Sequence, residues 1–179
     1  MKTVLGLDIS STTIGWAMIS YDKENYSLES YGHIKPSKNK KYSKIEKLSM
    51  TYDMVKEVIH ELNPDEIAIE QYASKFSSGR STARTIIVLS TYNEALSLCC
   101  YREFGKIPFR YAPVTIRSSM SKYFDKKIKS KDDAFEFVCN NVSNFKTKTN
   151  RLLNIKKESY DESDAICVAL CHFIKNNQE

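Results

Sequence analysis

The 179-residue sequence predicts an α/β fold with a mixed five-stranded sheet, in which three antiparallel strands precede parallel strands and helices flank the sheet. Three short apolar stretches follow one another at the N-terminus with only polar turns between them, which is typical of antiparallel strands. A stretch with helical spacing then separates them from a fourth apolar stretch, and the order strand, helix, strand implies a crossover to a parallel neighbour. The hydrophobic fraction of 41% and the charged fraction of 27% are ordinary for a globular protein. We therefore expect residues 1–179 to form a single domain.

The first half of the chain supplies four of the predicted strands. The first three strands are expected at residues 3–9, 14–21 and 26–34. Residues 43–62 carry apolar side chains roughly on one helical stripe, and this helix ends at Asn63-Pro64. The fourth strand is expected at residues 66–70.

The second half is mainly helical. Residues 85–101 contain a single charge, at Glu94, which indicates a helix that must be covered on more than one side, either in the core or at a subunit interface. A short fifth strand is expected at residues 109–111. The remaining helices are predicted at 113–124 after Pro113, at 131–141 after the N-cap Ser130, and at 160–175, where Ser159 and Glu162 fit a capping box.

Four carboxylates stand at the ends of apolar elements. Asp8 lies in the first strand, Glu70 ends the fourth, and Asp161 and Asp164 begin the last helix. Because an ionised carboxylate is costly to bury without compensation, these residues suggest one converged, cation-filled site. A first-turn position near the helix dipole would explain Asp161 without such a site, but not Asp164. Carboxylates without a His/Cys cluster favour Mg²⁺, with Mn²⁺ able to substitute, and two such ions suit phosphodiester cleavage.

The positive charge is concentrated in one third of the chain. Residues 113–157 contain eleven Lys or Arg and four Asp or Glu, a balance of +7, whereas the whole chain has a formal net charge of +5. Such a basic segment is expected for a polyanionic partner, although a solvated lysine-rich face would have the same composition. A basic patch beside an acidic metal site is the combination that a nuclease needs.

The order of these motifs resembles the RuvC family of Holliday-junction resolvases, within the RNase H-like superfamily. The resemblance rests on Asp8 in a first strand, on Ala68-Ile69-Glu70-Gln71 at the end of a fourth strand, and on Asp161-x-x-Asp164-Ala165 at the last helix. It spans nearly the whole chain, and Tyr111-Ala112-Pro113 followed by a basic helix also matches.

This resemblance implies an RNase H-like fold and a crossover junction endodeoxyribonuclease. Asp8, Glu70, Asp161 and Asp164 would be the catalytic, metal-binding carboxylates of a two-ion site. The family also implies a homodimer, with the 85–101 helix at or near the interface, that acts on branched DNA and nicks opposing strands of a four-way junction. The residues expected to bind DNA are Tyr72, Lys75, Arg80, Arg117, Lys126, Lys127, Lys129 and Lys131.

The sequence departs from the family after Glu70. An aromatic residue common in bacterial members would fall at Ala73, whereas Tyr72 lies one place earlier, and the loop 73–82 differs in character. These departures suggest a divergent member, from a phage or a virus, with broader activity on forks and flaps. A DNA-binding module without catalysis is a further alternative, as is a sugar-kinase-like phosphate loop at Asp8-x-Ser10-x-Thr12, for which one domain is too small.

The composition also predicts which partners are absent. Apolar runs are too short to span a membrane, and glycine-rich nucleotide loops are missing, so neither a membrane nor a nucleotide cofactor is expected. Five cysteines do not form a secreted disulfide framework. We expect an intracellular protein, in the cytoplasm of a bacterium or of a phage- or virus-infected cell.

Overall fold

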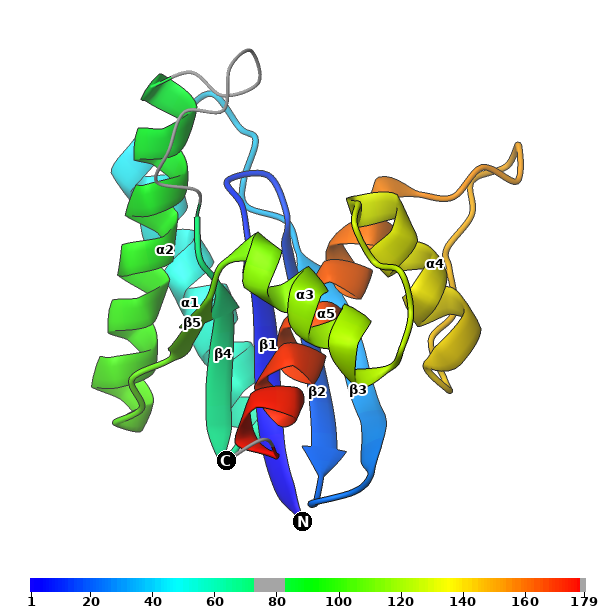
Figure 1. Ribbon diagram of the computed structural model, residues 1–179. Helices are drawn as coiled ribbons and strands as arrows, with labels where there is room; N and C mark the ends of the chain where they lie inside the picture. Colours follow the sequence, from blue (N-terminus) through cyan, green and yellow to red (C-terminus); the bar gives the residue numbers. More distant parts are fainter. Residues whose placement is uncertain (73–82, 178–179) are drawn as a thin grey trace.

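The computed structural model describes residues 1–72 and 83–177, in which one five-stranded sheet lies between two layers of helices (Figure 1). The strands are β1 Lys2–Ile9, β2 Ile14–Tyr21, β3 Tyr26–Ile34, β4 Glu66–Glu70 and β5 Phe109–Tyr111. The helices are α1 Lys44–Leu62, α2 Ala83–Phe104, α3 Pro113–Tyr123, α4 Lys131–Asn141 and α5 Lys157–Asn176. All the predicted elements are present within a few residues of their expected bounds. The prediction of a single domain over residues 1–179 stays a prediction.

The sheet has the predicted mixed topology. Its strand order is β3-β2-β1-β4-β5. The pairs β1–β2 and β2–β3 are antiparallel, whereas β4 is parallel to β1 and β5 is parallel to β4. The crossover through α1 therefore joins two parallel strands, as expected.

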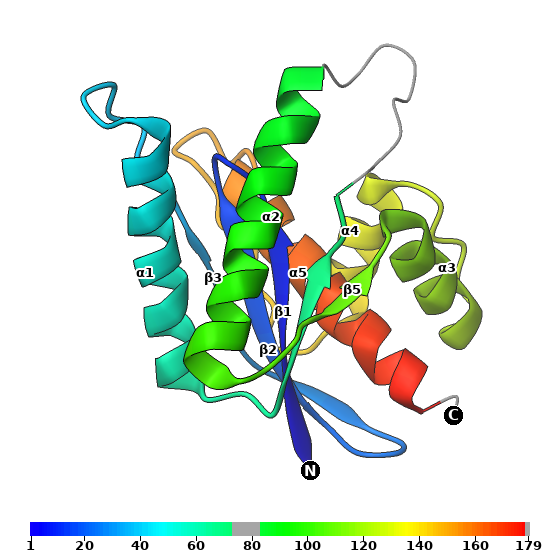
Figure 2. The ribbon, with the colours of Figure 1, turned by 90° about the vertical axis from the view of Figure 1, so that its left-hand side faces the viewer.

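The alternation of side chains along β1 and β4 determines what each face of the sheet presents. Leu5 and Leu7 pack with α1 and α2 on one face, whereas Val4 packs with α5 on the other. Asp8 is on the same face as Val4, and in β4 the same alternation places Glu70 on the face of Ala68. Figure 2 shows α1 and α2 in front of the sheet and α5 behind it. Both acidic residues at the ends of these strands thus face α5.

Two glycines allow α5 to approach the sheet closely. A Cβ atom added at Gly6 in β1 would lie 2.8 Å from the backbone nitrogen of Ala169, and one added at Gly15 in β2 would overlap the carbonyl group of Asp161. Any larger residue would push the helix away from the strands. The backbone of α5 is therefore held directly against β2 at Asp161 and against β1 at Ala165 and Ala169.

The predicted capping box at the start of the last helix is wrong. Helix α5 starts at Lys157, and its N-cap Lys156 makes no side-chain capping bond. Ser159 and Glu162 are buried and bind other parts of the chain, as described below. Ser130, in contrast, caps α4 as predicted, through a reciprocal bond with Asp133.

Among residues 1–72 and 83–177, helix α2 is packed on one side and exposes large apolar side chains on another. Tyr92, Leu96 and Cys100 pack against β1 and α1, whereas Leu98 and Tyr101 are exposed. The expected cover of this helix on a second side, by a partner subunit, stays a prediction. Across residues 1–72 and 83–177, no helix combines the length and the apolar character that crossing a membrane requires.

Candidate active site

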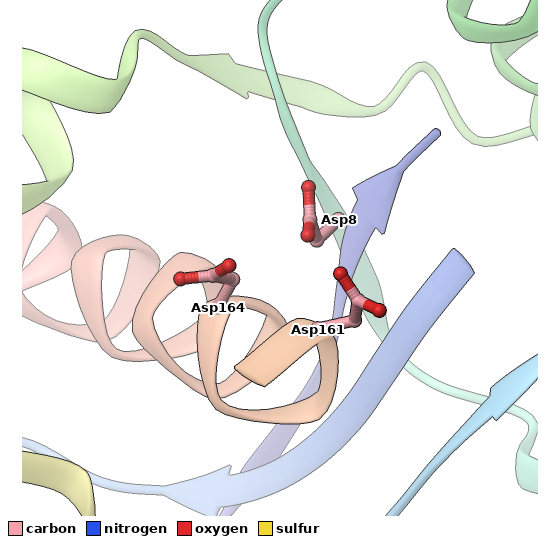
Figure 3. A group of neighbouring side chains, drawn as sticks. All are labelled: Asp8, Asp161 and Asp164. Carbon is pink, nitrogen blue, oxygen red and sulfur yellow. The ribbon is translucent and has the colours of Figure 1, made fainter. Parts of the chain in front are cut away.

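Three carboxylates converge at one end of the sheet. Asp8 comes from the end of β1, and Asp161 and Asp164 come from successive turns of α5 (Figure 3). Each offers an oxygen atom within 4.8 Å of the others. The spacing of three residues places Asp161 and Asp164 on one helix face, and the close contact of α5 with β2 brings that face to Asp8.

Glu70 lies beside this cluster at the end of β4. The charge of Asp164 raises the pKa of Glu70, and the charge of Glu70 raises the pKa of Asp8. Glu70 is not one of the three carboxylates within 4.8 Å of one another. The structure therefore brings together all four predicted acidic residues, with Glu70 at the margin of the group.

Burial and mutual repulsion change the ionisation of these acids. Burial, followed by the charges of Glu70 and Asp164, raises the pKa of Asp8 well above its usual value. Burial and the charge of Asp164 raise the pKa of Glu70 to about 7. Burial also raises the pKa of Asp164 to about 6, although the Lys131 ammonium opposes this change. Without a cation between them, the four groups cannot all be ionised at low cost.

Two basic side chains lie next to the acids, as predicted. The Lys131 ammonium forms an ion pair with Asp164 Oδ2. Burial lowers the pKa of Lys131, but the nearby carboxylates, Asp164 first, raise it above its usual value overall. The charge of Arg117, on α3, lowers the pKa of both Glu70 and Asp164. Positive charge therefore reaches the cluster from α3 and from the start of α4.

The residues of this site fit a hard divalent cation. All the donor atoms are carboxylate oxygens, which Mg²⁺ and Mn²⁺ prefer. Asp161 is only 6% exposed, and within the described part of the chain its Oδ2 atom has no hydrogen-bond partner. A buried carboxylate oxygen without a partner is costly unless a ligand completes it.

The other residues predicted to bind DNA lie in three different parts of the chain. Tyr72 follows β4 after one residue and is half-buried. Lys75 and Arg80 lie outside the described residues. The remaining lysines are exposed on the connection between α3 and α4, and these are Lys126, Lys127 and Lys129.

The sequence does not predict the role of Glu162, a buried group next to the acids. Glu162 is fully buried, and its Oε1 atom binds His33 Nδ1 at 2.7 Å and the Lys148 ammonium. It therefore ties α5 to β3 and to the segment before α5. The serine three residues earlier made Glu162 resemble a capping residue, and no local signal marks its tertiary contacts.

The chain matches the family model described as crossover junction endodeoxyribonuclease RuvC over residues 4–129. A protein of that name from Finegoldia magna is 28% identical over 175 residues, which cover 94% of this chain and 91% of the relative. One from Ehrlichia ruminantium is 29% identical over 178 residues, which cover 94% of each chain. These relatives are bacterial, so the suggested phage or viral origin stays a prediction.

Solved structures share the fold over nearly the whole chain. The structure of Thermus thermophilus RuvC in complex with a Holliday junction substrate has a TM-score of 0.71 at 15% identity, covering 99% of this chain and 96% of the other. The yeast mitochondrial Holliday junction resolvase Ydc2 has a TM-score of 0.70 at 16% identity, covering 98% and 79%. The fowlpox virus resolvase with its substrate DNA has a TM-score of 0.61 at 14% identity, covering 97% and 98%. These likenesses confirm the predicted RNase H-like fold.

Glu70 should make the metal-free protein less stable as the pH rises. Its pKa increases from 4.5 to about 7 on folding. Between these values the folded protein binds more protons than the unfolded chain, so the free energy of unfolding falls with increasing pH. We expect the free energy of unfolding of Glu70→Gln to be higher than that of the wild type by at most about 3 kcal/mol at about pH 8. At about pH 4 the two values should be nearly equal. Urea denaturation at both pH values measures this difference.

Glu103→Gln is the matched control, because hydrogen bonds from Lys56 and Tyr52 lower the pKa of Glu103. This variant should be no more stable than the wild type at about pH 8. An advantage of Glu70→Gln that does not grow with pH would contradict the electrostatic description of the site.

Proposed function

The chain belongs to the RuvC family of crossover junction endodeoxyribonucleases, and from this we propose that it resolves four-way DNA junctions by paired nicks. The convergence of Asp8, Asp161 and Asp164, with Glu70 at the margin, is the observation that carries this proposal. The family is metal-dependent, and the acidic cluster offers the oxygen ligands such a nuclease needs. A DNA-binding module without catalysis would not need all four acids.

We assign the four carboxylates to the binding of two divalent ions, with Mg²⁺ as the natural metal and Mn²⁺ as a substitute. When bound, such ions activate a water molecule and stabilise the leaving oxygen of a phosphodiester. The chain's own cations have a complementary role. Lys131 and Arg117 lie beside the acids and can bind a phosphate group, so that DNA approaches an otherwise repulsive cluster.

We propose that the acting unit is a homodimer formed along α2. The exposed side chains Leu98 and Tyr101 line a groove with Ile107 and Pro108, and the ion pair of Glu94 with Arg110 forms its polar side. Exposed apolar side chains in such a groove are more stable against a second copy of the chain than in contact with water. Two sites related by a two-fold axis would then face opposing strands of a symmetric junction. The predicted intracellular location stays a prediction.

Cleavage of several branched and linear DNAs should distinguish a strict resolvase from a general branched-DNA nuclease. We expect paired symmetric nicks in an end-labelled four-way junction in the presence of Mg²⁺ or Mn²⁺, and no cleavage in EDTA. The same experiment includes a three-way fork, a flap and a linear duplex. Comparable cleavage of forks and flaps would instead favour the broader enzyme that the sequence around Tyr72 suggests. An absence of cleavage of all four DNAs would contradict both.

Asp8→Asn and Glu70→Gln should each abolish cleavage but leave junction binding largely intact, because the acids bind metal whereas the basic residues bind DNA. End-labelled cleavage and gel-shift titrations measure the two properties separately. Asp53→Asn, at an exposed position of α1, is the control and should cleave as the wild type does. Nicking that persists in both Asp8→Asn and Glu70→Gln would disprove the site assignment.

Reversing the charge of Lys126, Lys127 and Lys129 to Glu should weaken binding and flatten its dependence on salt. If each lysine contacts one phosphate, the slope of log affinity against log salt decreases in magnitude by about 2.7. Binding titrations over a range of salt concentrations measure this slope. Lys23→Glu, in the turn between β2 and β3, should change it little. An unchanged slope in the triple variant would place the DNA elsewhere.

A further inference from the structure

A groove lies between the first turns of α1 and α2, on the face of the sheet opposite to α5. Its volume is about 520 Å³, a size typical of sites that hold a small organic group. Figure 2 shows that both helices begin at the same end of the molecule. Ile45 and Ile87 are 70% and 65% exposed, so much of the apolar wall contacts solvent. This wall consists of Ile45, Leu48, Ile87 and Val88. We refer to this hollow as the α1–α2 groove.

The other side of the α1–α2 groove is positively charged. Within the described part of the chain none of its lysines forms an ion pair, whereas the nearby Lys35 is paired with Glu158. Residues 35–47 contain six lysines and one acid, Glu46. The Glu46 carboxylate is engaged in the cap of α1, where it accepts a hydrogen bond from Ser43 N–H at 2.6 Å. The lysines that line the groove are Lys38, Lys44 and Lys47.

The α1–α2 groove begins close to the candidate active site. Its lining includes Ser11, in the turn between β1 and β2. Ser11 follows Asp8 by three residues, so their Cα atoms are at most about 11 Å apart. Asp8 faces α5, whereas the groove lies on the opposite face, so this turn is the edge between the two. The groove is therefore within reach of a nucleotide that adjoins a phosphate bound at the acids.

The chemistry of the α1–α2 groove matches that of a nucleotide. A phosphate complements the lysines, and an unpaired base offers its flat face to the apolar wall. An acidic peptide with apolar side chains has similar chemistry. The proposed function, however, already brings DNA to Asp8, at the edge of the groove, whereas no feature of the chain brings a peptide there.

The position of α2 also favours DNA at a branch point. The homodimer that we propose forms along α2, and the α1–α2 groove is lined by the first turns of that helix. The groove therefore lies close to the two-fold axis, where a bound junction has its branch point. A base that is already poorly stacked is the least costly to remove from a duplex, and a branch point supplies such bases.

We propose that the α1–α2 groove binds a nucleotide that neighbours the scissile phosphate, with its unpaired base against Ile45 and the adjoining phosphates against the lysines. This inference rests on the proposed function, because it takes DNA bound at the carboxylates as its starting point. Lys131 and Arg117 contact the strand on one side of the acidic cluster, and the groove contacts it on the other.

Removal of one base at a time from the DNA tests this contact. Four-way junctions with a single abasic site, placed at successive positions from the branch point, are titrated in EDTA, so that affinity is measured without cleavage. We expect an abasic site at one position to weaken wild-type binding by about fivefold, because the missing base no longer buries apolar surface. In Ile45→Ser the same abasic site should weaken binding by less than about twofold, since the two changes remove the same contact.

Leu152→Ser is the matched control. Leu152 is 79% exposed in the segment before α5, on the other side of the molecule from α2 (Figure 1). This variant should show the same loss of affinity for the abasic junction as the wild type. An equal loss in Ile45→Ser and in the wild type would overturn the proposal. A smaller loss in Leu152→Ser as well would also overturn it, because the effect would not be specific to the groove.

The lysines are tested separately with the triple variant Lys38→Gln/Lys44→Gln/Lys47→Gln. If each lysine contacts one phosphate, the slope of log affinity against log salt decreases in magnitude by about 2.7. Lys23→Gln, in the turn between β2 and β3, should leave the slope as in the wild type. An unchanged slope in the triple variant would overturn the proposal and leave the groove to another anionic ligand, such as an acidic peptide. A reduced slope with the full abasic loss in Ile45→Ser would indicate phosphate contacts alone and would overturn it too.

These titrations distinguish this inference from the proposed function. If the wild type cleaves no branched DNA with Mg²⁺ or Mn²⁺ but shows an abasic loss that depends on Ile45, the proposed function fails and the nucleotide site stands. If cleavage is normal and the abasic loss does not depend on Ile45, the nucleotide site fails alone.

Discussion

The mutual repulsion of buried carboxylates is the constraint on which the site depends. Asp8, Asp161 and Asp164 are held with oxygen atoms within 4.8 Å of one another. Burial raises the pKa of all three, and the charges of neighbouring acids raise the pKa of Asp8 and Asp164 further. The repulsion would push these carboxylates apart if α5 could move away from the sheet. It does not, because α5 packs on β1 and β2 at Gly6 and Gly15, where no side chain intervenes. Backbone packing thus opposes the electrostatic repulsion.

A positive charge beside the carboxylates reduces their mutual repulsion. Lys131 is paired with Asp164 and acts on Asp8 and Glu70, so it provides a cation to the cluster. A divalent ion would compete for the same carboxylate oxygens and release Lys131 for another anion. The phosphate of an incoming DNA strand is the anion that the proposed reaction supplies. Under the proposed function, the same lysine would stabilise the metal-free site and bind substrate in the metal-loaded one.

Alternation and helical spacing made most of the fold and the acidic site predictable. Asp8 and Glu70 end strands that are apolar on both faces, and the spacing of Asp161 and Asp164 places them on one helix face. What could not be predicted depends on tertiary contacts. Glu162 follows Ser159 by three residues, as in a capping box, but the helix starts earlier and its carboxylate binds His33 and Lys148 instead. The ion pair between Lys131 and Asp164 likewise joins residues far apart in sequence.

Anomalous diffraction from crystals grown with Mn²⁺ would test the central claim most directly. If the repulsive cluster is a metal site, manganese should lie among the carboxylates of Asp8, Glu70, Asp161 and Asp164, and the Lys131 ammonium should have left Asp164. Manganese bound elsewhere, with the Lys131–Asp164 ion pair intact, would contradict it. In that case the four acids would be a structural feature of the fold, and the catalytic assignment would have to be abandoned.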